Sequence, residues 1–172
     1  MMRKNYDEPM FTDVVRCEQD CTTNEVEQQI RQLCQEQSFA VLATQGDGQP
    51  YTSLIAFAAN EDLTELVFCT PVQTRKFHLL QQNTQVSVMI DNRANQPDSI
   101  NLISGLTMTG RATVPEDPST KQFWEERLLH KHPYLKGFVQ SPNASLVVIQ
   151  AVRYFYVRRF QEVYQWIPNT SR

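Results

Sequence analysis

Residues 39–59 carry the sequence pattern of a β-hairpin. An apolar run at 39–44 is followed by Gly-Asp-Gly at 46–48 and by a second apolar run at 50–59. Glycine adopts the positive φ angles of tight turns without a steric penalty, so glycines between two such runs favour a reversal of the chain. The segment therefore predicts two adjacent antiparallel strands.

Similar patterns recur along the chain. Further strands are expected at 65–69, 85–90, 100–114 and 145–160, and single helices at 22–36, 73–82 and 119–131. Gly105 and Gly110 interrupt one of these segments, so we expect a bend or a β-bulge there. The sequence thus predicts a mainly β (α+β) protein with about six antiparallel strands, closed or nearly closed into a barrel with peripheral helices.

One domain is expected to account for all 172 residues. No repeat, low-complexity tract or linker divides the sequence, and a chain of this length can bury a proper core. We expect the polar residues 1–21 to form an N-terminal arm, residues 134–143 to form a loop, and residues 161–172 to form a C-terminal tail.

Charge and hydropathy argue against several classes of protein. The formal net charge is −3 and the pI is near 5.6, whereas a nucleic-acid-binding domain needs a basic face. No apolar run reaches the ~18 residues that span a bilayer, and the N-terminal residues lack the apolar segment of a secretory signal. The cysteines and histidines show no paired metal-binding spacing. We expect a cytoplasmic protein without nucleic-acid, membrane or metal partners.

Two hydroxyls and two cations gather where the strand at 65–69 gives way to the helix at 73–82. They belong to Thr70, Thr74, Arg75 and Lys76. A helix start offers unpaired backbone N–H groups, and Arg and Lys bind phosphate oxygens, so the cluster suits a phosphate monoester. From these residues alone, a capped surface helix with solvated cations is the simpler interpretation.

Residues 38–91 resemble the FMN-binding split-barrel family that includes pyridoxamine 5′-phosphate oxidase. The resemblance rests on motifs in a fixed order: Phe39-Ala40-Val41-Leu42-Ala43-Thr44, Gly46-Asp47-Gly48-Gln49-Pro50-Tyr51, Phe68-Cys69-Thr70 with Thr74-Arg75-Lys76, and Val86-Ser87-Val88-Met89-Ile90. A later Gly110-Arg111-Ala112 is similar to the Gly-x-Ala of the family's next strand, so residues 25–160 can be aligned with the pattern. Each motif is weak alone, but the ordered set is specific and favours the phosphate-binding interpretation.

The resemblance implies a six-stranded antiparallel split barrel that works as a homodimer, with FMN at the subunit interface. It implies that the phosphate is held by Thr70, Thr74, Arg75 and Lys76. It also implies that one strand segment runs beside the isoalloxazine ring, namely Ser53, Leu54, Ile55 and Ala56. From the partner chain, residues 101–108 and Trp166 are further candidates to cover the ring.

The sequence departs from the oxidase itself at two places. Ala58 stands where the oxidase carries a basic residue, and residues 154–172 contain no counterpart of its arginine–histidine pair. Oxidation of vitamin B6 is therefore not the expected reaction. We expect an FMN-dependent oxidoreductase acting on an unidentified small molecule, and no catalytic residue is assigned.

A binding protein without catalysis is the alternative. Proteins with related split barrels hold haem, a deazaflavin or a flavin used as a sensor. Haem usually requires an axial protein ligand, and the candidates here are His78, His130, His132 and Cys69.

Overall fold

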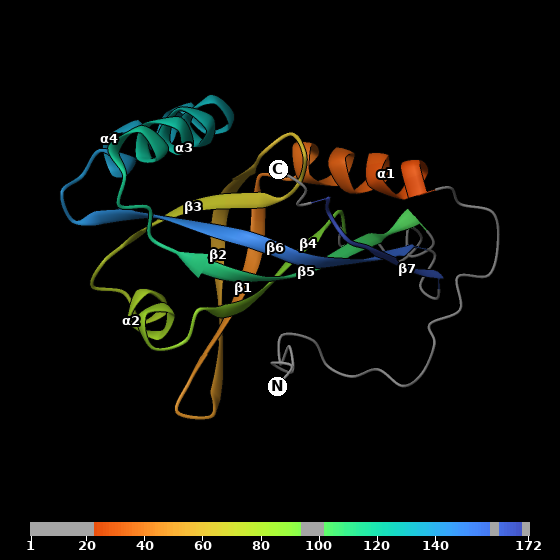
Figure 1. The fold of residues 1–172 in the computed structure, drawn as a ribbon, viewed down its shortest axis with the longest axis horizontal. Helices are drawn as coiled ribbons and strands as arrows, with labels where there is room; N and C mark the ends of the chain where they lie inside the picture. The colour runs from red at the N-terminus through yellow and green to blue at the C-terminus, as the bar shows by residue number, and fades with distance from the viewer. Residues whose placement is uncertain (1–22, 94–101, 159–161, 170–172) are drawn as a thin grey trace, which may run out of the picture.

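Seven strands pair antiparallel in one continuous sheet in the computed structural model, which describes residues 23–93, 102–158 and 162–169 (Figure 1). The N-terminal arm expected at 1–21 lies outside the described residues. In chain order the strands are β1 (Phe39–Gly46), β2 (Gln49–Ala59), β3 (Glu65–Pro71), β4 (Gln85–Asp91), β5 (Ser104–Thr113), β6 (Ala144–Arg158) and β7 (Glu162–Trp166).

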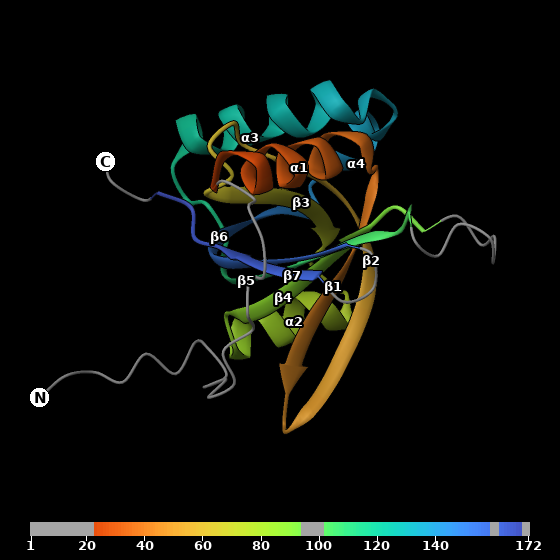
Figure 2. The ribbon, with the colours of Figure 1, turned by 90° about the vertical axis from the view of Figure 1, so that its right-hand side faces the viewer.

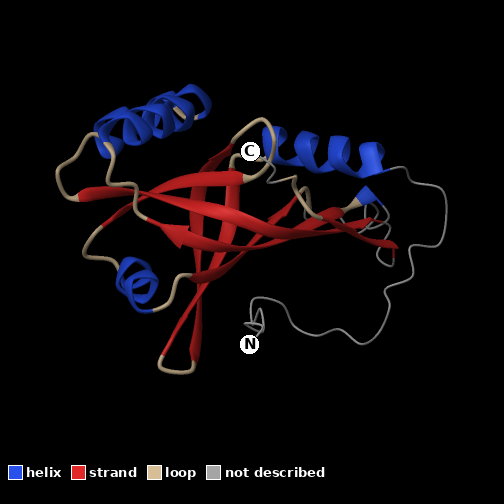
Figure 3. Cartoon of the chain, in the orientation of Figure 1, coloured by secondary structure: helices blue, strands red, loops and turns tan. Residues whose placement is uncertain are grey.

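The sheet closes on itself through six of these strands. Their order is β3-β2-β1-β4-β5-β6, and β3 also pairs with β6, so β7 lies outside the ring, against β6. Figure 3 shows how strands make up the body of the molecule while helices lie around it. The predicted six-stranded antiparallel barrel with peripheral helices is confirmed.

The predicted hairpin is formed by β1 and β2, which face each other in eight pairs from Phe39–Ala56 to Gly46–Gln49. Asp47 and Gly48 take positive φ angles of 52° and 76° at its turn. The ladders that join this hairpin to the rest of the barrel are much shorter, with three facing pairs between β1 and β4 and three between β2 and β3. The hairpin is thus attached to the barrel along two short seams.

The expected irregularity in the 100–114 segment lies at the pairing of β5 with β6. Thr109 faces Arg153 and Gly110 faces Ala151, so the register shifts by one residue between them. A Cβ atom on Gly110 would lie only 2.6 Å from the carbonyl oxygen of Gln150. Glycine is therefore required at this close approach of two backbones.

The helices lie on two opposite sides of the barrel. They are α1 (Thr23–Glu36), α2 (Arg75–Gln82), α3 (Pro118–Lys131) and the single turn α4 (Lys136–Val139), which follows a 3-10 turn at Pro133–Leu135. Figure 2 shows α1 and α3 together on one side and α2 on the other. None of the helices in the described ranges is long and apolar enough to cross a membrane.

Two expectations about the C-terminal third are wrong. The sequence predicts a loop at residues 134–143, but this segment contains α4, whose Val139 is buried with Trp124 and Leu128 of α3. The tail expected at 161–172 contains β7, because Tyr164 and Trp166 pack on Tyr156 and Tyr154 of β6 (ring centroids 6.4 and 5.5 Å apart). Both short elements depend on distant packing partners.

Candidate functional site

The end of β3 and the start of α2 bring together two of the predicted phosphate-binding residues. Thr70 is almost fully buried, and its hydroxyl lies 3.1 Å from that of Thr74. Thr74 caps α2: its hydroxyl donates to the Pro71 carbonyl (2.9 Å) and accepts from the Phe77 amide (3.4 Å). The two hydroxyls therefore hold the strand end and the helix start in one fixed arrangement.

Arg75 and Lys76 are the first two residues of α2. The amide groups of a first helical turn have no partner within the helix, and they carry the positive end of the helix dipole. Arg75 is exposed, with its guanidinium carbon 5.2 Å from the ring centroid of Tyr51 on β2. Lys76 is half-buried, and this burial lowers the pKa of its amine. Neither side chain forms an ion pair with any residue that the structure describes.

The strand segment 53–56 has one edge without strand pairing. β2 pairs with β1 along residues 49–56, but its other edge pairs with β3 only from Phe57 to Ala59 in the described ranges. Side chains alternate along it: Ile55 is in the core, Leu54 is 65% exposed, and Ala56 lies on the same face as Leu54. The hydroxyl oxygen of Ser53 is buried and lacks a hydrogen-bond partner among the described residues.

Tyr51 connects the two halves of this site, although it is not among the site residues predicted from the sequence. Its ring lies against Arg75, and its carbonyl accepts a hydrogen bond from Thr44 (3.3 Å). The structure thus places the start of α2 beside the beginning of β2, with Ser53 two residues further along the same face of the strand. Apart from the position of Tyr51 directly after the hairpin turn, the sequence gives no signal for this contact.

The four candidate haem ligands lie in different surroundings. His78 and His130 are exposed on α2 and α3. His132 is buried, with Nε2 2.9 Å from the Phe57 carbonyl and Nδ1 3.1 Å from the Tyr134 hydroxyl, so both ring nitrogens are occupied. Burial lowers the pKa of His132 and raises that of Cys69 to about 11. An imidazole whose two ring nitrogens are already hydrogen-bonded and a protonated thiol are poor axial ligands.

An exposed apolar face covers the outside of the hairpin and its neighbour β4. Phe39, Leu54 and Met89 are 50%, 65% and 41% exposed, and Val41 faces both Leu54 and Met89 in the register. A groove of about 380 Å³ is lined by these same residues together with the end of α1. Trp166, by contrast, is buried against Tyr154 of its own chain. The predicted segment beside the ring thus borders an apolar surface that suits association.

Two adjoining grooves lie on the other side of the barrel. One lies between α3 and the β2–β3 turn, and the other lies between α1, α3 and the same turn. Their volumes are about 710 and 750 Å³, and they share Asn60, Glu61, Phe123 and Arg127. None of the eight residues predicted to bind the cofactor lines either groove. These hollows are therefore separate from the arrangement around α2.

The sequence matches a known protein family. Residues 26–158 match the family model described as pyridoxamine 5′-phosphate oxidase. No curated protein matches the sequence.

Several solved structures share the fold at low sequence identity. A haem-binding protein from Mycobacterium smegmatis is similar over 86% of this chain and 59% of its own (TM-score 0.72, 17% identity), so this chain spans about three fifths of that protein. HutZ, a haem storage protein from Vibrio cholerae, is similar over 83% and 94% (TM-score 0.63, 20%). An FAD-binding protein from Mesorhizobium loti is similar over 75% and 91% (TM-score 0.60, 15%).

Proposed function

The chain belongs to the pyridoxamine 5′-phosphate oxidase family, and from this premise we propose that it is a flavoprotein that binds FMN at the start of α2. Thr70, Thr74, Arg75 and Lys76 hold the phosphate. The segment 53–56 of β2 lies beside the isoalloxazine ring.

The proposal is supported by Arg75 and Lys76, two cations at a helix start that have no anionic partner among the described residues and lie next to a strand edge without pairing in those residues. Arg75 and Lys76 stand where the helix dipole already disfavours positive charge, and Lys76 is partly desolvated as well. A bound phosphate monoester would offset both the unfavourable helix dipole and the desolvation of Lys76. Its oxygens accept hydrogen bonds from the amides at the helix start, and its negative charge neutralises the two side chains. The buried Ser53 hydroxyl offers a further polar contact for the same ligand.

The residues around this site bind and orient the cofactor. FMN, when bound, supplies one- or two-electron transfer to a small molecule. Thr70 and Thr74 fix the position of the phosphate because each hydroxyl is already held by the other. Ile55 anchors the strand through the core, while the side chains of Leu54 and Ala56 face outward. We assign no side chain as a general acid or base, and the proposed class is oxidoreductase.

The exposed apolar face supports a homodimer with FMN at the subunit interface. Leu54 belongs both to the proposed ring-binding segment and to that face, so a second copy packed there would border the flavin. Light scattering should give twice the 20.0 kDa of one chain. Leu54→Glu, which places a charge on the apolar face, should give the single-chain mass, whereas the exposed control Thr113→Glu should not. A wild-type mass of one chain at micromolar concentration would contradict the dimer.

The function is tested by the absorption spectrum of the purified protein and by titration with FMN. We expect flavin absorption in the blue, or quenching of flavin fluorescence when FMN is added to colourless protein. Protein that stays colourless and leaves the fluorescence of added FMN unchanged would overturn the proposal.

Haem binding is the second candidate, because two structurally similar proteins are named for it. His132 and Cys69 are unsuited as ligands, which leaves the exposed His78 and His130. A Soret band that disappears in His78→Ala or His130→Ala would favour haem over flavin.

A further inference from the structure

The larger groove between α1 and α3 has apolar walls and a basic interior. Its apolar lining comes from Ala58, Ala59, Leu63 and Phe123. The cations Arg31 and Arg127 are about 30% exposed, whereas the side chain of Glu61 is 93% exposed. Positive charge therefore lies deeper in the groove than negative charge.

Two contacts hold the side chain of Lys131 at this groove. Lys131 ends α3, its Nζ donates to the Cys34 carbonyl of α1 (2.7 Å), and the same atom lies 3.9 Å from the ring centroid of the buried Phe57. The long side chain is thus held across the gap between the two helices. Lys131 is one of the residues that line the groove of about 750 Å³.

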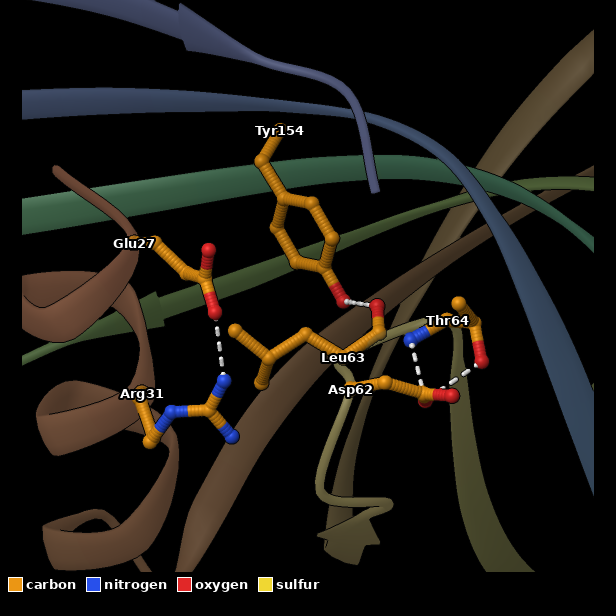
Figure 4. A network of polar contacts seen from close by, with 6 residues as sticks. All are labelled: Glu27, Arg31, Asp62, Leu63, Thr64 and Tyr154. Atoms are coloured by element: carbon orange, nitrogen blue, oxygen red, sulfur yellow. Dashed lines mark hydrogen bonds and ion pairs between the residues drawn. The ribbon is translucent and has the colours of Figure 1, made fainter. Parts of the chain in front are cut away.

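A turn with an unusual backbone conformation, at Leu63, lines part of the groove. Leu63 is buried and has a φ of 58°, a left-handed conformation that is costly for a leucine. Figure 4 shows how it is held: the Tyr154 hydroxyl donates to the Leu63 carbonyl (2.7 Å), and Asp62 accepts from the amide and hydroxyl of Thr64. Strain that is maintained by several specific bonds is characteristic of ligand sites.

We propose that this groove is a second small-molecule site, in which the Lys131 amine forms an imine with an aldehyde or ketone that also carries a carboxylate. The site lies on the opposite side of the barrel from α2 and does not depend on the flavin proposal (Figure 2).

The arginines of the groove favour a ligand that carries a carboxylate. Arg31 already pairs with Glu27 (2.6 Å), as Figure 4 shows. Arg127 is fixed by its Nε on the Ala59 carbonyl, and its nearest carboxylate, Glu61, is 4.0 Å away and largely solvated. Its planar guanidinium is therefore the better partner for an incoming carboxylate. Phe123 and Leu63 favour a carbonyl compound with an apolar or aromatic body.

The reaction needs no oxidant or reductant. The nitrogen lone pair attacks the carbonyl carbon, and the resulting carbinolamine loses its oxygen as water while the C=N bond forms. The nitrogen must be unprotonated for the first step.

The surroundings of Lys131 favour the unprotonated amine. Burial lowers its pKa to about 8, so at pH 7.5 about a quarter of the amines are neutral, against about one in a thousand for an ordinary lysine. The charged and titratable groups around it are Arg31 and Cys34 on α1, Glu61 on the β2–β3 turn, and Glu126, Arg127, His130 and His132 on and after α3. Two arginines and two glutamates are among these groups, so the lower pKa of Lys131 comes from its burial and not from an excess of neighbouring cations.

The test is reductive trapping with 4-formylbenzoate and cyanoborohydride at pH 7.5, followed by peptide mapping of the full chain. We expect the adduct on Lys131 at least ten times more often than on the exposed Lys121 and Lys136, which serve as internal controls. Lys131→Arg keeps the cation but cannot form an imine, so this adduct should vanish while far-UV circular dichroism stays unchanged. Labelling of any other lysine as strong as that of Lys131 would overturn the proposal.

A second pair of measurements tests the carboxylate contact. Arg127→Gln should reduce trapping of 4-formylbenzoate at Lys131 about fivefold to tenfold, and it should leave trapping of benzaldehyde nearly unchanged. Equal loss for both aldehydes would show that Arg127 only supports the fold, and it would overturn the assignment of a carboxylate ligand.

Discussion

Lys76 and Lys131 have the same side chain and lie on opposite sides of the barrel, at opposite ends of their helices. Burial lowers the pKa of both. Lys131 stands in the last turn of α3, where the helix dipole favours a cation, and it has a carbonyl and an aromatic ring as partners. Lys76 stands in the first turn of α2, where the dipole opposes it, and no described residue is its ion-pair partner.

The two lysines differ in what the protein itself supplies to them. The Lys131 amine already has a carbonyl partner and an aromatic ring within the chain, so its groove can form without a bound molecule. Lys76 and its neighbour Arg75 carry an electrostatic cost in the free protein that only an anion removes. The two regions should therefore respond in opposite ways to substitution, to pH and to added FMN.

The largest effect is expected at Arg75. Arg75→Ala removes a charge-assisted contact to the proposed phosphate and should weaken FMN binding by about 1.5–3 kcal/mol, or about 10- to 150-fold. Fluorescence titration measures the affinity for FMN, and Arg111→Ala, on the exposed side of β5, serves as a charge-matched control. Equal affinities of wild type and Arg75→Ala would show that the phosphate is held elsewhere.

A smaller effect is expected from the cap of α2. Thr74→Ala removes the hydroxyl that accepts from the Phe77 amide and should lower the free energy of unfolding by about 1 kcal/mol. Urea denaturation measures this loss. Thr74→Ser keeps the hydroxyl and should restore most of the stability, so a serine variant as unstable as the alanine variant would contradict a capping role.

A still smaller change, of opposite sign, is expected at Lys76. Lys76→Gln removes a cation from the positive end of α2 and should raise the stability of the ligand-free protein by about 0.3–1 kcal/mol, while it weakens FMN binding. Urea denaturation without FMN and fluorescence titration provide the two values. Loss of stability in the ligand-free variant would show that the fold already satisfies this charge.

The pH dependence separates the two lysines further. The pKa of Lys131 in the folded protein is about 8, below its ordinary value of 10.5. The free-energy cost of burying its charge is therefore present in full below pH 8. This cost disappears as the pH rises from 8 towards 10.5. Wild type should therefore gain stability relative to Lys131→Met over that interval. Thermal unfolding of both proteins at pH 7, 8, 9 and 10 measures the difference, and a constant difference would contradict a buried amine.

The fold could be predicted where its signals are local. The hairpin depends on a glycine-containing turn and the register shift on Gly110, and both are visible in the sequence. Elements that depend on distant partners were missed: β7 needs the tyrosines of β6, and α4 needs the apolar face of α3.

The candidate site divides in the same way. The contact of Thr70 with Thr74 spans one turn and follows from the strand–helix pattern. The contact of Arg75 with Tyr51 arises only when the barrel closes. The same is true of the hydrogen bond between buried His132 and the carbonyl of Phe57, 75 residues earlier in the chain. Reactive surroundings such as those of Lys131 are likewise made by packing two helices together, for which no sequence spacing is diagnostic.

The two short seams beside the β1–β2 hairpin have a consequence for how the molecule opens. With three facing pairs on each side against eight within it, the hairpin should detach as one cooperative piece before the β5–β6 pair separates. Hydrogen–deuterium exchange should then show amides of both hairpin strands becoming labelled together. A ligand that bridges α2 and β2 would fasten this piece to the barrel and slow the labelling of both strands at once.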